Sequence, residues 1–92
     1  MSTARFHTEV FFSGHVQGVG FRYQTLQVAK EFDVAGSVGN LPDGRVHLLA
    51  EGEEKDVQAF VDELRDRMSP FIRDAEIHTR QGPSRHRGFT IV

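Results

Sequence analysis

The chain has 92 residues, and we expect residues 1–92 to form one domain with a single core. It has no cysteine, which excludes disulfides, thiol nucleophiles and cysteine metal ligands. Its formal net charge of -2 gives no bulk electrostatic support to binding of nucleic acid or anionic membranes. Residues 1–5 lack the apolar run of a targeting segment, and no stretch is apolar enough to span a bilayer. We therefore expect a cytoplasmic protein with neither a nucleic-acid nor a membrane partner.

A glycine-rich stretch follows the first predicted strand, residues 6–13. Residues 14–22 read Gly-His-Val-Gln-Gly-Val-Gly-Phe-Arg, and a helical pattern begins near Phe21. The glycines allow tight turns at positive φ, and the free N–H groups and dipole of the helix start attract anions. Arg22 opposes this dipole but favours the same ligand, an oxyanion such as phosphate. An ordinary turn with a solvated arginine is the alternative.

The stretch is neither of the two common phosphate loops. Five residues separate Gly14 from Gly20 and no Lys-Ser/Thr pair follows, so it is not a Walker A loop. Tyr23 stands where a dinucleotide-binding loop has its third glycine. A nucleotide held in either of those two ways is therefore not expected.

The rest of the chain alternates between helical and strand-like patterns. Apolar residues at helical spacing run from Phe21 to about Asp33 and again from Val57 to Met68. The other elements expected are strands at residues 34–41, 45–51, 75–80 and 89–92, with a loop at residues 81–84. This order predicts an α+β, ferredoxin-like split βαβ sandwich. Two helices would cover one face of an antiparallel sheet, with a short extra C-terminal strand.

The loop sequence resembles the acylphosphatase signature at every fixed position. A second motif of that family fits as well, because residues 36, 38, 40, 44, 46 and 52 are Gly, Val, Asn, Gly, Val and Gly at the right spacing. Two positions depart from this second motif. Ser37 stands where the family usually has an aromatic residue, and Gly39 where it usually has a basic one. The resemblance covers essentially the whole chain.

The resemblance implies a small free-standing enzyme that hydrolyses acyl phosphates to a carboxylate and phosphate without metal or cofactor. Arg22 and Asn40 fill the catalytic positions. Arg22 would hold phosphoryl oxygens with its fork of donors, and Asn40 would orient the attacking water. Backbone amides would complete the phosphate-binding loop. The amides expected to face the phosphate are those of His15, Val16, Gln17, Gly18, Val19 and Gly20. The expected partners are the acyl phosphate and inorganic phosphate, as product and competitor, and the chain is expected to be a monomer.

Several other interpretations are open at this point. Asn40 precedes a predicted turn, Leu41-Pro42-Asp43-Gly44, where asparagine is common for structural reasons alone. The five histidines show no helical pairing typical of metal ligands, and His15 as a phosphohistidine falls at a variable position of the motif. RNA binding is disfavoured because the strand at residues 45–51 has no aromatic residue. A weakly active or inactive module that binds phosphate or carbamoyl phosphate is the main functional alternative.

Overall fold

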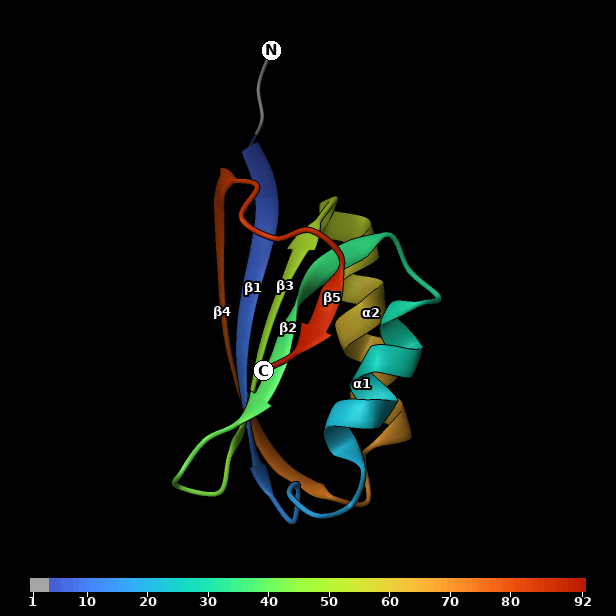
Figure 1. Cartoon of the computed structure of the whole chain (residues 1–92), viewed down its shortest axis with the longest axis vertical. Coiled ribbons are helices and arrows are strands. Elements are labelled where there is room, and N and C mark those ends of the chain that lie inside the picture. Colours follow the sequence, from blue (N-terminus) through green and yellow to red (C-terminus); the bar gives the residue numbers. More distant parts are fainter. Residues whose placement is uncertain (1–3) are drawn as a thin grey trace.

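A five-stranded sheet carries two helices on one face, and its other face is open (Figure 1). The computed structural model describes residues 4–92; the expectation about the extreme N-terminus therefore rests partly on residues 1–3, which lie outside it. The elements in chain order are β1 (Ala4–Gly14), α1 (Phe21–Ala29), β2 (Val34–Asn40), β3 (Val46–Gly52), α2 (Glu54–Arg67), β4 (Ile72–Pro83) and β5 (Phe89–Ile91).

The strands lie in the order β4-β1-β3-β2-β5. Neighbours among the first four are antiparallel, whereas β5 runs parallel to β2. The predicted α+β sandwich with two helices on one face and a short extra strand is confirmed, and β5 makes the sheet mixed. Among residues 4–92, no helix combines the length and the apolar character needed to cross a membrane.

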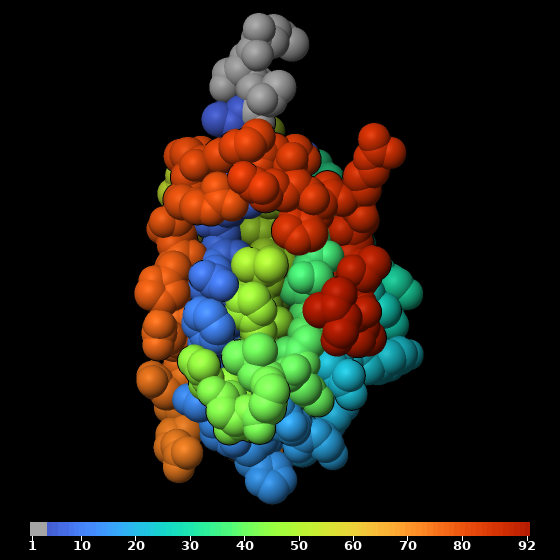
Figure 2. All heavy atoms as spheres, turned by 60° about the vertical axis from the view of Figure 1, so that its left-hand side comes forward, coloured from blue at the N-terminus to red at the C-terminus, as the bar shows by residue number. Residues whose placement is uncertain are grey.

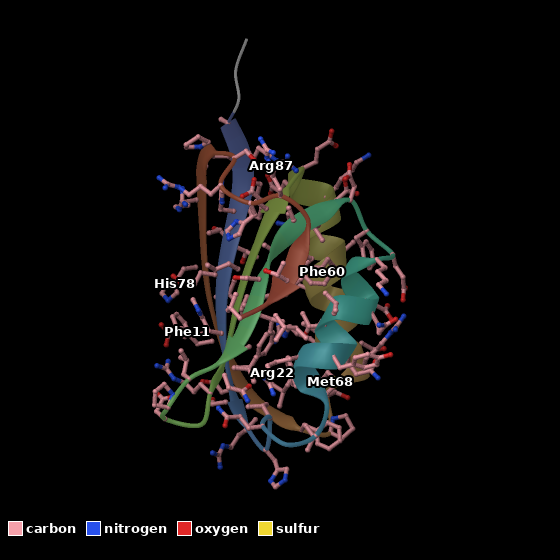
Figure 3. All side chains as sticks on the ribbon, in the orientation of Figure 1. Phe11, Arg22, Phe60, Met68, His78 and Arg87 are labelled. Carbon is pink, nitrogen blue, oxygen red and sulfur yellow. The ribbon has the colours of Figure 1, made fainter. Side chains whose placement is uncertain are left out.

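Side-chain alternation along β1 explains how the sheet divides into two faces. Val10 and Phe12 are fully buried and belong to the core between sheet and helices. Phe11 points to the opposite face, where its ring stacks on His47 with centroids 4.7 Å apart. The Arg45 guanidinium lies 4.7 Å from the centroid of the same ring. Figure 3 shows Phe11 and His78 on this open face, away from both helices.

The two helices bury the apolar residues that their spacing indicates. Val57, Phe60, Val61 and Leu64 of α2 are buried, as predicted. Helix α1 buries Phe21, Thr25, Val28 and Ala29 but ends at Ala29, four residues before the predicted end at Asp33. The chain tightens there because the N–H groups of residues 30–32 each donate to the carbonyl three residues earlier.

The predicted loop at residues 81–84 is wrong over most of its length. Strand β4 continues to Pro83, with Gln81 opposite Phe6 and Pro83 opposite Ala4. The imidazole of His7 fixes this end, since its Nε2 lies 2.9 Å from the Pro83 carbonyl oxygen. Turn-forming residues are compatible with an edge strand, where a proline removes no hydrogen bond that the sheet needs.

The carboxylate of Glu51 fastens the connection between β4 and β5. Glu51 has no exposed surface, and its Oε1 accepts hydrogen bonds from the N–H groups of Arg85 and His86, at 2.8 and 2.9 Å. The His86 ring nitrogen Nδ1 lies 2.9 Å from the same oxygen. Burial alone would raise the pKa of this carboxyl, but the hydrogen bonds to its charged form outweigh burial and lower the pKa to about 2.

This carboxylate makes the stability of the fold depend on acid pH. Because the pKa of Glu51 falls from 4.5 to about 2 on folding, its contribution is complete above pH 4.5 and is lost as the pH drops toward 2. In Glu51→Gln, we expect the free energy of unfolding at pH 7 to fall by about 1–3 kcal/mol, because a charged hydrogen-bond acceptor is lost. Its decline between pH 4.5 and 2 should also be shallower, as measured by urea unfolding at several pH values.

The control is Glu53→Gln, which removes one exposed carboxylate nearby and should retain the wild-type pH profile. A Glu51→Gln profile parallel to the wild-type profile between pH 4.5 and 2 would contradict the role assigned to Glu51.

Candidate functional site

A cleft of about 250 Å³ lies where the start of α1, the end of β2 and β5 meet. The structure brings Arg22 and Asn40 together in this cleft, although they belong to different elements. Figure 3 shows Arg22 between α1 and the end of β2. The residues that line the cleft are Val16, Gly18, Gly20, Phe21, Arg22, Tyr23, Asn40 and Ile91.

The two side chains predicted to be catalytic are both without a protein partner within residues 4–92. Neither Arg22 nor Asn40 makes a side-chain hydrogen bond or ion pair within residues 4–92, and both are exposed. Arg22 lies in the first turn of α1, and that turn contains no acidic residue. Asn40 is the last residue of β2, paired opposite Val46 of β3. Five donors of a guanidinium and one amide therefore face a common space without a competing carboxylate in the lining.

The loop that leads into α1 owes its shape to Gly18 and Gly20. Their φ angles are 78° and 79°, in the left-handed region that other residues rarely adopt. A Cβ atom added at either position would meet nothing within 4 Å, so backbone conformation and not crowding is the constraint. Gly20 directly precedes α1, and no side chain caps the helix. The N–H groups at the helix start are therefore left for another acceptor.

The backbone amides of the glycine loop fall into two groups, those that have an acceptor in the protein and those that have none. The N–H of His15 donates to the Phe71 carbonyl at 2.9 Å, and the N–H of Gln24 donates to the Gly20 carbonyl at 2.9 Å. Between them, the amides of residues 16–23 have no acceptor within residues 4–92. The backbone N–H of His15 thus already has an acceptor, unlike the other amides expected to form the phosphate-binding loop. Val16, Gly18 and Gly20 line the cleft, whereas Gln17 and Val19 do not.

The side chain of Gln17 has a role that the sequence did not indicate. Its Nε2 donates to the carbonyl oxygens of Leu41 and Arg45, at 2.9 and 3.0 Å. These two residues flank the turn between β2 and β3, directly after Asn40. The amide of Gln17 therefore joins the glycine loop to the hairpin that carries Asn40. The sequence predicted only a backbone role for Gln17.

The departure at Gly39 is explained by the C-terminal residue. The N–H of Val92 donates to the Val38 carbonyl at 2.9 Å, which extends the pairing of β5 with β2. A Cβ atom on Gly39 would lie 2.9 Å from Val92 Cγ2 and 2.9 Å from its carbonyl oxygen. Glycine thus lets Val92 pack on β2 beside Asn40. Ser37, the other departure, is buried on the same strand and lies opposite Thr90.

Three residues of the cleft lining, Phe21, Tyr23 and Ile91, were not predicted as site residues from the sequence. Tyr23 offered a signal, because it is an aromatic residue of the first helical turn that lies off the buried stripe and is 59% exposed. Ile91 offered none, since its position follows from the parallel pairing of β5 with β2. The described residues, 4–92, contain no group of three His, Asp or Glu side chains arranged to hold a metal ion.

Fold and cleft together define a small α+β protein with a cleft at a helix N-terminus, lined by one guanidinium and by loop residues whose backbone amides have no acceptor within residues 4–92. Residues 8–91 match the family model for acylphosphatase. An acylphosphatase of Archaeoglobus fulgidus is 55% identical over 53 residues, which is 58% of this chain and 60% of that protein. An acylphosphatase of Listeria welshimeri is 43% identical over 70 residues, covering 76% and 75% of the two chains.

A solved structure leads to the same family. The crystal structure of acylphosphatase from Bacillus subtilis superimposes with a TM-score of 0.85 at 34% sequence identity, over 95% of this chain and 98% of the other. The chain belongs to the acylphosphatase family. Its enzymatic class is therefore that of the family, hydrolysis of acyl phosphates.

The Gln17 contact predicts a coupling between the glycine loop and the hairpin. Gln17→Leu removes two hydrogen bonds to carbonyls that each keep a backbone partner, so the free energy of unfolding should fall by only about 1–2 kcal/mol. Activity measured per folded molecule should fall at least tenfold, because loop and Asn40 lose their fixed separation. Phosphate release and urea unfolding on the same samples test this.

The matched control is Gln58→Leu, since the side-chain amide of Gln58 bonds only to Glu54 within α2. Full activity of a folded Gln17→Leu variant would show that the contact stabilises the fold without positioning the cleft.

Proposed function

We propose that this chain hydrolyses the carboxyl–phosphate bond of acyl phosphates by attack of a water molecule on phosphorus, without metal or cofactor. In this mechanism Arg22 and the loop amides hold the phosphoryl group, and Asn40 positions the water. One observation carries the proposal. Arg22 and Asn40, both without protein partners among residues 4–92, line one cleft at the uncapped start of α1.

Binding of the phosphoryl group rests on three sources of positive potential. The planar guanidinium of Arg22 offers parallel donors that match two phosphoryl oxygens, a geometry that lysine lacks. The free amides of residues 16–20 offer further donors in a loop kept open by Gly18 and Gly20. The helix dipole adds to both. A chain with net charge -2 thus binds an anion through local donors.

The reaction needs little chemistry beyond binding and orientation. Water attacks phosphorus as the bond from phosphorus to the bridging oxygen breaks, and the bonding pair leaves with the carboxylate. A carboxylic acid has a pKa of about 4, so this leaving group departs as an anion without a general acid. One proton of the attacking water passes to a phosphoryl oxygen, giving carboxylate and dihydrogen phosphate. Catalysis then consists of holding the phosphoryl group and stabilising its equatorial oxygens.

Asn40 suits the placement of the attacking water. Its side-chain amide has both a donor and an acceptor, so it can orient a water molecule through either atom type. It has no charge and therefore does not compete with the phosphoryl group for Arg22. Its place at the end of β2 is set by pairing with Val46 of β3, and β2 is flanked by β5 on its other side at residues 36–38.

The proposal is tested first by phosphate release from benzoyl phosphate in the presence of excess EDTA. We expect turnover to be unaffected by the chelator, because the anion is held by Arg22 and amides. Inorganic phosphate should inhibit competitively. Activity that EDTA abolishes and a divalent ion restores would contradict the mechanism. Binding of phosphate without turnover would favour the module that only binds phosphate or carbamoyl phosphate.

Substitutions of Arg22 and of Asn40 should have different effects on phosphate binding and on kcat. Arg22 would contact phosphoryl oxygens before and during reaction, so Arg22→Ala should weaken phosphate binding and lower kcat together. Arg22→Lys should restore only part of both, because it keeps the charge and loses the fork. Asn40 would contact mainly the water, so Asn40→Ala should lower kcat by a factor on the order of 10² with little change in phosphate Kd.

Measurement of kcat, phosphate Kd and the thermal midpoint on the same Asn40→Ala sample separates this role from a turn-forming one. A turn-forming asparagine would lower the midpoint and leave kcat per folded molecule near normal. That result would end the water-positioning hypothesis.

A further inference from the structure

Exposed apolar side chains gather at the mouth of the cleft. Among residues 4–92 four large apolar side chains are exposed: Tyr23 (59%), Ile77 (41%), Ile91 (42%) and Val92 (76%). Tyr23 and Ile91 line the cleft, and Val92 packs at Gly39 beside Asn40. In Figure 2 the dark red C-terminal residues lie directly beside the light blue start of α1 and the green end of β2. Exposed apolar surface concentrated at one opening indicates a ligand.

These side chains are distinct from the groups assigned to phosphate. Among residues 4–92, Arg22 is the only charged residue in the cleft lining, and Asn40 and the loop amides are the other polar groups assigned to the reaction. Tyr23 follows Arg22 in α1, and Ile91 comes from β5 across the opening. A ligand anchored by an anionic end at Arg22 would therefore extend past apolar walls contributed by two elements.

We propose that Tyr23, Ile91 and Val92 form an acyl-binding rim that selects acyl phosphates with a bulky apolar acyl group, aromatic or branched. The inference rests on the proposed function and adds the substrate class. With the phosphoryl group held in the loop, the acyl group projects toward solvent between Tyr23 and Ile91. An apolar acyl group loses water-exposed surface there, and so do both side chains. An acetyl group has less apolar surface to bury there.

The rim is tested by binding of compounds that cannot be hydrolysed at phosphorus. Benzoylphosphonate and acetylphosphonate share the phosphorus anion and differ in the size of the acyl group. By calorimetry, we expect benzoylphosphonate to bind the wild-type protein about tenfold more tightly than acetylphosphonate, as one well-packed aromatic contact allows. In Tyr23→Ala and in Ile91→Ala this ratio should fall to about threefold or less. The Kd values of acetylphosphonate and inorganic phosphate should stay within about twofold.

Ile77→Ala is the matched control, because Ile77 is as exposed as Ile91 but lies on β4, outside this cleft. It should leave the ratio unchanged. Thermal unfolding checks that β5 stays docked in Ile91→Ala, and Tyr23→Ala, on the exposed side of α1, tests the rim independently of β5. The ratio of kcat/KM for benzoyl and acetyl phosphate should change in parallel with the binding ratio.

The outcomes separate the rim from the proposed function. Equal binding of the two phosphonates by the wild-type protein, or an equal change in Ile77→Ala, would overturn the rim and leave hydrolysis of acyl phosphates intact. Absence of turnover with both phosphates would overturn the proposed function. The phosphonate ratio would then still decide whether the rim binds apolar groups.

Discussion

Two buried side chains anchor the glycine loop, while the backbone amides of residues 16–23 make no hydrogen bond within residues 4–92. Val16 and Phe21 are 1% and 2% exposed and belong to the core between the sheet and the helices. The Phe21 ring packs against Phe12 of β1, with centroids 5.0 Å apart. Because apolar burial fixes the two ends of the turn, the amides between them need no partner within the protein. The proposed function of the cleft depends on this arrangement, in which buried side chains anchor the loop and its backbone amides stay available to a ligand.

The same arrangement explains why an unfavourable charge is tolerated at the start of α1. Arg22 in the first turn opposes the helix dipole, by about 0.3–1 kcal/mol for an exposed site. Side-chain capping, the usual remedy at such an end, is absent from this helix. Burial of Phe21, worth roughly 1.5–3 kcal/mol, offsets such a cost. A bound anion would interact favourably with both the dipole and the guanidinium, so the local instability of the free protein would contribute to the proposed affinity for phosphate.

The extent to which the sequence predicted this site follows from the range of the interactions involved. Arg22 and Gly18 lie in one local motif, and the periodicity of helices and strands depends on neighbouring residues. The fold and the loop could therefore be predicted from the sequence. The hydrogen bond of the His15 backbone amide could not be predicted, because its acceptor is the carbonyl of Phe71, far along the chain. The contacts of Gln17 with the hairpin could not be predicted from the sequence either. Both depend on elements far apart in the chain that only the folded sheet brings together.

Strand β5 shows how a remote charge supports the cleft. β5 has only three residues and lies at the edge of the sheet, so its own pairing with β2 gives it little stability. Its position is set at the other end by the turn that Glu51 fastens, where the Gly36 N–H also donates to the Gly88 carbonyl at 2.9 Å. The loop is anchored by Val16 and Phe21, which do not titrate. We therefore expect acid to displace β5, with Ile91, from the cleft before it disturbs the glycine loop.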